Sequence, residues 1–281
     1  MISSILIGRK GSKGLPGKNT MSVLGRPLCS YPMLAATNAP SIDRHFVCTD
    51  DEFIAEIAKG FGMEAIPRPP ELNTDEALGE EVYKYVSEVI GDKYGEQELL
   101  VLLMCNSPMI LGQSIEKGLR VLRENQDYDS AVSVSKYNMY SPIRARCINE
   151  QGLLDPFIPF SRYDNADQIS CDRNCMKDTW FADMGVSIIR PWCLSTMETN
   201  LPPQRWMGNR IYPLKQRGGL DADYDYQIPQ VDFWLRAAGF DEARTPYEDK
   251  PVGSSRELSE ANRETSARLD VEHGGTAPVI L

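Results

Sequence analysis

Four basic side chains fall among three glycines near the start of the chain. The basic residues are Arg9, Lys10, Lys13 and Lys18, and the glycines are Gly11, Gly14 and Gly17. Glycine lets the backbone turn so that its N–H groups approach an anion, and Arg and Lys supply the positive charge that a polyphosphate requires. The spacing therefore predicts a phosphate-binding loop over residues 9–18.

Two familiar kinds of phosphate loop do not fit this segment. In a Walker A loop, four residues separate the first glycine from Gly-Lys-Ser/Thr. Here Ser12 stands where that first glycine belongs, and Asn19 rather than Ser or Thr follows Lys18. The dinucleotide fingerprint needs Gly-x-Gly-x-x-Gly, whereas the glycines between positions 8 and 14 fall three residues apart. The loop is therefore of another kind.

A pair of carboxylates late in the chain could hold a metal ion. Asp221 and Asp223 alternate with Leu220 and Ala222, so in an extended segment both carboxylates point to one face and can share a Mg²⁺ or Mn²⁺ ion. Without a cation the two charges would repel. An alternative interpretation is a solvated acidic turn, since Asp225 continues the pattern. Such a pair could also hold a nucleotide sugar in a metal-dependent glycosyltransferase.

Strands and helices alternate along most of the chain and would position these groups. The hydrophobic pattern predicts strands at residues 2–8, 44–49, 98–104, 130–134 and 183–190, and helices at residues 27–39, 51–62, 77–89, 113–124 and 227–238. This alternation predicts an α/β fold whose mostly parallel sheet is covered on both faces. Ligands of such sheets bind outside the carboxyl ends of the strands, where the basic loop and the acidic pair are expected.

Five motifs, in order, resemble those of the cytidylyltransferases that activate 2-keto-3-deoxy sugar acids. The basic loop at residues 9–19 most closely resembles that of the acylneuraminate cytidylyltransferase and CMP-KDO synthetase family, and residues 47–58, 68–75, 102–108 and 220–223 resemble its later motifs. The resemblance implies a Rossmann-like three-layer nucleotidyltransferase fold. It also implies an enzyme that transfers CMP from CTP to an anionic acceptor of the sialic acid type and releases pyrophosphate.

The same resemblance implies roles for individual residues. The nucleotide-binding positions are Arg9, Gly11, Ser12, Lys13, Lys18, Asn19 and Arg68. The acceptor-binding positions are Met104, Asn106, Ser107 and Arg173. The catalytic positions are Arg9, Lys18, Asp221 and Asp223, of which the two aspartates would bind the metal.

Several departures from the family pattern fall on the acceptor side. Met104 stands where the family has Gln, and residues 183–185 read Asp-Met-Gly where Glu-Asn-Gly is expected. Methionine can replace neither the donor nor the acceptor of the glutamine amide, which suggests a different acceptor. Alternatives are therefore the same transfer to a modified sugar acid, a sugar phosphate or a phosphonate. A nucleotide-binding relative without catalysis is a further hypothesis.

Length and composition set the domain organisation. The 281 residues, 42% of them hydrophobic, can build one large domain, predicted here as residues 1–240. The strand-helix rhythm is lost over residues 135–181, which the resemblance identifies as an insertion that packs on a second subunit, so a homodimer is expected. Residues 241–281 read as a polar C-terminal extension.

Charge and hydropathy exclude several classes of partner. The net charge of -10 argues against nucleic acid, since a binder of nucleic acid needs a clustered basic face. A nucleoside triphosphate and a small anionic acceptor fit the local basic loop better. No apolar run approaches the roughly 20 residues that span a bilayer, and seven cysteines without a regular framework suit reduced thiols. A cytoplasmic location without membrane attachment is expected.

Overall fold

The computed structural model describes residues 1–248 except residues 12–13, 75, 165 and 171–176. The chain divides into two compact units, Met1–Arg244 and Thr245–Leu281, and the first unit carries all the elements described below.

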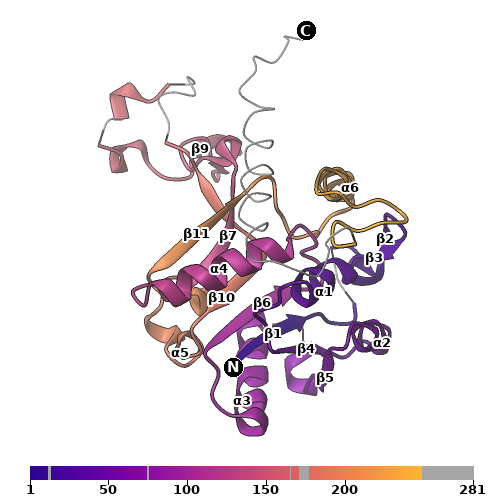
Figure 1. Ribbon diagram of the computed structural model, residues 1–281. Coiled ribbons are helices and arrows are strands. Elements are labelled where there is room, and N and C mark those ends of the chain that lie inside the picture. Colours follow the sequence, from indigo (N-terminus) through magenta and orange to yellow (C-terminus); the bar gives the residue numbers. More distant parts are fainter. Residues whose placement is uncertain (12–13, 75, 165, 171–176, 249–281) are drawn as a thin grey trace. The chain divides into compact units, whose positions relative to one another are not determined.

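A seven-stranded sheet forms the centre of the first unit (Figure 1). Its strands are β1 (Ile2–Ile7), β4 (Arg44–Thr49), β5 (Glu64–Pro67), β6 (Leu99–Met104), β7 (Ser130–Lys136), β10 (Trp180–Ile189) and β11 (Ile211–Gln216). They lie in the order β11-β7-β10-β6-β1-β4-β5. Neighbouring strands are parallel except at β10, which runs antiparallel to both β6 and β7. The predicted α/β fold with a mostly parallel sheet is confirmed.

Helices cover both faces of this sheet and make it the middle of three layers (Figure 1). The helices are α1 (Ser30–Thr37), α2 (Glu52–Gly60), α3 (Gly79–Tyr94), α4 (Gly112–Glu124), α5 (Trp192–Ser195) and α6 (Ile228–Ala237). Val101 and Leu103 of β6 pack in one core with residues of α1, α2 and α4. Leu100 and Leu102 pack in a second core with residues of α3 and α5. None of the helices in the described ranges is long and apolar enough to cross a bilayer.

Two strands that the sequence did not predict, β5 and β11, form the edges of the sheet. β5 ends in Pro67, and β11 contains Pro213 and ends in two polar residues, Lys215 and Gln216. Proline is tolerated in edge strands because one side of the backbone needs no partner. Edge strands therefore lack the continuous apolar runs that revealed the central strands.

Some predicted helix boundaries were wrong. The first helix was predicted to start at residue 27, but it begins at Ser30. Residue 27 instead ends a two-stranded hairpin of β2 (Ser22–Val23) and β3 (Arg26–Pro27). Helix α3 continues to Tyr94 rather than residue 89, and Gly95 with φ +83 ends it. Glycine adopts this left-handed conformation without steric cost, so it terminates helices readily.

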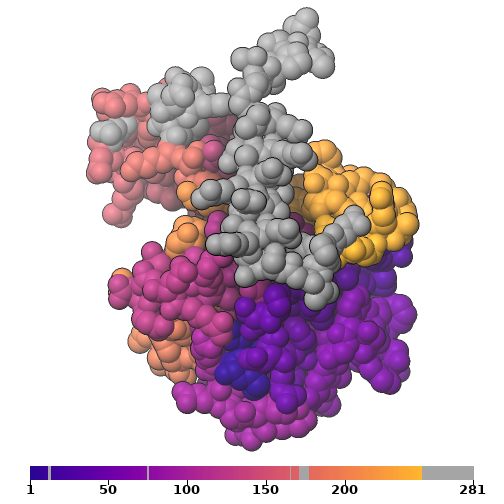
Figure 2. All heavy atoms as spheres, in the orientation of Figure 1, coloured from indigo at the N-terminus to yellow at the C-terminus, as the bar shows by residue number. Residues whose placement is uncertain are grey.

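The insertion between β7 and β10 contains a small antiparallel hairpin, β8 (Arg146–Ile148) and β9 (Leu154–Pro156). Ile148 and Leu154 are directly paired across it, and their side chains are 75% and 69% exposed. Figure 2 shows the atoms of this insertion as a lobe that stands out from the sheet-and-helix body. We call residues 137–179 the arm. Its role as a contact with a second subunit stays a prediction.

The five cysteines that the structure describes are unpaired. Burial raises the pKa of Cys29 to about 12 and that of Cys48 to about 11, so both remain protonated thiols near neutral pH. Cys171 and Cys175 lie outside the described residues.

Candidate active site

The basic loop leaves the carboxyl end of β1 and crosses the ends of two neighbouring strands. A Cβ atom on Gly8 would lie 2.5 Å from Sγ of Cys105, directly after β6, so only glycine lets the chain pass. The backbone N–H of Lys10 donates to Oδ1 of Asp50 at 2.7 Å, directly after β4. The start of the loop is thus fixed over the carboxyl ends of β1, β4 and β6.

The far end of the loop closes back on its beginning. Nδ2 of Asn19 donates to the backbone oxygen of Arg9 at 3.2 Å. Gly11 and Gly17 adopt φ values of +82 and +70, the left-handed region that glycine enters without strain. These contacts give the segment the tight turns predicted for a phosphate loop. The predicted residues Ser12 and Lys13 lie outside the described residues.

An ion pair joins the basic loop to the acidic segment although 205 residues separate the partners along the chain. Nζ of Lys18 contacts Oδ1 of Asp223, and the side chains are 15% and 45% exposed. A Cβ atom on Gly14 would lie 2.8 Å from the backbone oxygen of Asp223, so loop and acidic segment are in van der Waals contact. The structure brings the predicted cation and the predicted carboxylate into one site.

Two side chains hold the acidic segment in place. Asn106 is the second residue after β6. Its backbone oxygen accepts from the backbone N–H of Ala222 at 2.8 Å, and its Nδ2 donates to Oδ1 of Asp223 at 3.3 Å. Oε1 of Gln227 accepts from the backbone N–H groups of Asp223 and Tyr224 at 2.7 and 2.8 Å. Sequence reasoning missed Gln227. A glutamine three residues after a helix-capping position was the available signal.

The electrostatics of Asp221 fit a cation site. Burial raises the pKa of Asp221, and the negative charge of Asp223 raises it further, whereas Lys18 acts in the opposite direction. A cation beside the two carboxylates would offset both the burial and the repulsion. The two aspartates supply the hard oxygen ligands that Mg²⁺ and Mn²⁺ prefer.

Two arginines, Arg9 of the loop and Arg68 after β5, are close enough to interact electrostatically. Nε and Nη2 of Arg68 donate to the backbone oxygen of Leu72 at 2.8 and 2.5 Å, and Nη1 of Arg9 donates to that of Thr74 at 3.2 Å. Burial lowers the pKa of Arg68, Cys48 and Asp50 act in the opposite direction, and the positive charge of Arg9 makes a smaller lowering contribution. A bound polyanion would offset the repulsion between the two guanidinium groups. The hydrogen bonds from Arg68 to Leu72 also stabilise the segment over residues 68–72.

The predicted acceptor residues are only partly gathered at the site. Met104 ends β6 opposite Ile7 and is half-buried, and Asn106 touches the acidic segment. Ser107 is fully buried, and its hydroxyl has no hydrogen-bond partner among the described residues. Asn106 rather than Ser107 therefore offers a polar group to the site. Arg173 lies outside the described residues.

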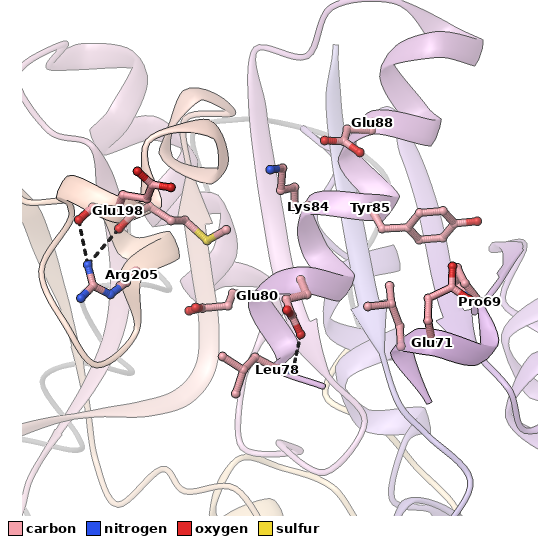
Figure 3. A pocket seen from close by; sticks show the side chains of 12 residues that line it. Pro69, Glu71, Leu78, Glu80, Lys84, Tyr85, Glu88, Glu198 and Arg205 are labelled. Atoms are coloured by element: carbon pink, nitrogen blue, oxygen red, sulfur yellow. Dashed lines mark hydrogen bonds between the residues drawn. The ribbon is translucent and has the colours of Figure 1, made fainter. Parts of the chain in front are cut away.

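A cleft of about 710 Å³ lies on the outer side of α3 and is lined by none of the predicted site residues (Figure 3). Glu80, Lys84 and Glu88 come to it from α3, while Glu198 and Arg205 border it from the segment after α5. Arg205 is held by the backbone oxygens of Met197 and Glu198 at 3.2 and 2.9 Å. The volume of this cleft does not identify it as the reaction site, because the phosphate-binding chemistry lies at the strand ends.

Curated proteins similar to this chain include N-acylneuraminate cytidylyltransferases. N-acylneuraminate cytidylyltransferase of Escherichia coli O18:K1:H7 (strain RS218 / NMEC) is 30% identical over 164 residues, which are 58% of this chain and 38% of that protein. The protein of the same name from Streptococcus agalactiae serotype III (strain NEM316) is 33% identical over 134 residues, 47% of this chain and 31% of that protein. The chain thus matches 38% and 31% of the length of these two relatives.

A solved structure supports the fold, and the family profile supports the membership. CMP:2-keto-3-deoxy-manno-octonic acid synthetase complexed with CTP superposes with a TM-score of 0.58 over 84% of this chain and 98% of that chain, at 18% identity. The expected Rossmann-like nucleotidyltransferase fold and the family resemblance are confirmed. The profile of the cytidylyltransferase family matches residues 4–147, more than half of the chain. This protein, with its basic loop fixed over the carboxyl ends of the central strands, belongs to the cytidylyltransferase family.

Proposed function

We propose that this protein transfers CMP from CTP to a 2-keto-3-deoxy sugar acid of the sialic acid type, in line with the N-acylneuraminate cytidylyltransferases that it resembles, and releases pyrophosphate. The ion pair of Lys18 with Asp223 carries the proposal. It joins a cation of the phosphate loop to a carboxylate suited to a metal ion, at the strand ends where an α/β sheet binds its ligands.

The residues would share the work of binding the triphosphate. The backbone N–H groups of the loop and the side chains of Arg9, Lys18 and Arg68 would neutralise the phosphates, with Ser12, Lys13 and Asn19 as further contacts. Transfer requires the acceptor hydroxyl oxygen to bond to the α phosphorus as the bond to the departing pyrophosphate breaks and the hydroxyl proton is released. Fixed charges around the α phosphate stabilise the charge that develops there.

Asp221 and Asp223 would hold a Mg²⁺ or Mn²⁺ ion. Within the described residues, no group of three or more His, Cys, Asp or Glu side chains is arranged to hold a metal. Two carboxylates are nevertheless sufficient here, because Mg²⁺ in nucleotide enzymes commonly takes one or two carboxylates and completes its shell with phosphate oxygens and water. When bound, the ion would polarise a phosphoryl oxygen and neutralise charge on the triphosphate.

Pyrophosphate release across a substrate panel tests the proposal. We expect release with CTP and not with ATP, GTP or UTP, in the presence of Mg²⁺ and one member of a panel of sugar acids. The panel also contains sugar phosphates and phosphonates, because Met104 offers no hydrogen bond where the family has an amide. Release with a phosphonate alone would establish an atypical acceptor. CTP binding without release from any pair would instead favour a nucleotide-binding protein without catalysis.

We propose in addition that the arm packs against a second copy of the chain in a homodimer. Large exposed apolar side chains gather on and beside it, namely Met139, Tyr140, Ile148, Leu153, Leu154, Phe157 and Phe181. Contiguous exposed apolar side chains of this number commonly mark an interaction surface.

We also propose a reducing, cytoplasmic setting for the reaction. The five cysteines that the structure describes are unpaired, which supports this setting.

Charges placed on the arm hairpin should abolish the dimer. Ile148 and Leu154 are paired and therefore project from the same face of the hairpin, so I148D and L154D together would bury two carboxylates in the proposed interface. Analytical ultracentrifugation should show a dimer for the unaltered chain and a monomer for the double variant. Phe53→Asp, an exposed apolar position on α2, serves as the control and should stay dimeric. An unaltered chain that sediments as a monomer would contradict the proposal.

A further inference from the structure

Strand β10 carries a strained irregularity close to the proposed metal site. Its pairing with β7 shifts register between Ala182 and Ser187. Within this bulge Met184 has φ 61, a left-handed conformation that is sterically unfavourable for a residue with a Cβ atom. Bulges and strained residues often re-aim a side chain next to a functional site. The side chain re-aimed here is that of Asp183.

Asp183 is 4% exposed, and its carboxylate is surrounded by hydrogen-bond donors. Oδ2 accepts from Oγ of Ser135 at 2.6 Å and from Nε2 of Gln216 at 2.9 Å. Oδ1 accepts from the backbone N–H of Gly185 at 3.2 Å. Three donors around one buried carboxylate fix its position. The carboxylate thereby ties together the ends of β7, β10 and β11.

This network reaches the acidic segment through Gly219. The Oγ of Ser135 that donates to Asp183 also accepts from the backbone N–H of Gly219 at 2.9 Å. A Cβ atom on Gly219 would lie 2.6 Å from Oδ2 of Asp183 and 2.4 Å from Nε2 of Gln216. The backbone of the turn at Gly219 therefore packs directly against these two side chains. Gly219 stands two residues before Asp221. The turn that presents Asp221 therefore rests on Ser135 and Asp183.

The geometry points to Ser135 and Asp183 as positioning residues, which hold the turn at Gly219 and thereby place Asp221 for the metal ion. This inference rests on the proposed function, because it assigns to these residues the support of the metal site in that reaction. Their effect passes through Gly219 to Asp221, whereas Gln227 and Asn106 hold the other end of the segment at Asp223.

Strand β7 offers a matched control for Ser135. Ser133 lies two residues earlier on the same face of β7 and is equally buried, at 1% exposure against 0% for Ser135. Its Oγ accepts from the backbone N–H of Val186 at 2.9 Å, on β10. Ser133→Ala and Ser135→Ala thus each remove one buried hydroxyl that accepts a backbone N–H, but only the second hydroxyl is bonded to Gly219.

Calorimetric titration of the full chain with CTP, once with MgCl₂ and once with EDTA, tests the inference. The ratio of the two affinities is the gain due to the metal. We expect Ser135→Ala to reduce this gain about 10-fold, in the range known for groups that orient metal ligands, and to leave the affinity in EDTA unchanged. Ser133→Ala should keep the gain of the unaltered chain. Asp183→Asn, checked for folding by thermal melting, should reduce the gain at least as much as Ser135→Ala.

Two outcomes separate the inference from the proposed function. Suppose that Mg²⁺ raises the CTP affinity of the unaltered chain as expected. If Ser135→Ala then keeps this gain, or if Ser133→Ala loses as much of it as Ser135→Ala does, the inference is overturned and the proposed function stands. An unaltered chain whose CTP affinity does not rise with Mg²⁺ would overturn the proposed function and the inference with it.

Discussion

Asp221→Asn is expected to lower kcat for CTP-dependent pyrophosphate release by about 10²–10³-fold, the usual loss when one fixed electrostatic group is removed from a reaction site. The amide keeps the size of the side chain but lacks the charge that binds a metal ion. Folding should be preserved, because burial and Asp223 already raise the pKa of Asp221 and make its charge unfavourable in the metal-free chain. Steady-state kinetics at saturating CTP and Mg²⁺ measure the effect.

Asp225→Asn is the matched control for this variant. It makes the same chemical change four residues later, at an exposed aspartate whose Oδ1 accepts from the backbone N–H of Tyr226 at 2.8 Å. Its kcat should equal that of the unaltered chain. If Asp221→Asn were as active as Asp225→Asn, the acidic segment would be a solvated turn, as one interpretation of the sequence allowed.

Lys18→Met should lower kcat/KM for CTP by about 10–150-fold, because a hydrogen bond to a charged group contributes about 1.5–3 kcal/mol. Methionine keeps the length and apolar stem of lysine and removes only the ammonium group. Lys10→Met makes the same change in the same loop at an exposed side chain and should have a much smaller effect. Equal losses in the two variants would mean that the loop acts only through its total charge.

The ion pair with Asp223 gives Lys18→Met a second expected effect of opposite sign. In the ligand-free chain the ammonium group of Lys18 forms an ion pair with Oδ1 of Asp223. It would therefore compete with a metal ion for that oxygen. Its removal should strengthen Mn²⁺ binding in the absence of CTP, which electron paramagnetic resonance of free Mn²⁺ measures. We infer that a bound triphosphate would attract Lys18 away from Asp223 and leave that carboxylate to the metal. Weaker Mn²⁺ binding in the variant would exclude this exchange.

Local sequence patterns were sufficient for the fold class and for the basic loop. Strand β6 is a continuous apolar run, and β1 and β4 each contain an apolar run of three residues, at 5–7 and 46–48. Buried parallel strands are recognisable by such runs. The glycines and cations of residues 9–18 lie within ten residues, so their chemistry could be judged without knowing the fold. The pair Asp221 and Asp223 was likewise visible, because alternation along an extended segment places both side chains on one face.

The tertiary structure alone decided which of these groups meet. Nothing in the sequence pairs Lys18 with Asp223, presses Gly14 against the backbone of Asp223, or connects Ser135 to the turn at Gly219. These contacts join residues that lie far apart along the chain, and they follow from strand order and from the antiparallel insertion of β10 between β6 and β7. Periodicity reports only on neighbours within a few residues. The packing of whole elements therefore determines how a phosphate loop and an acidic pair become one site.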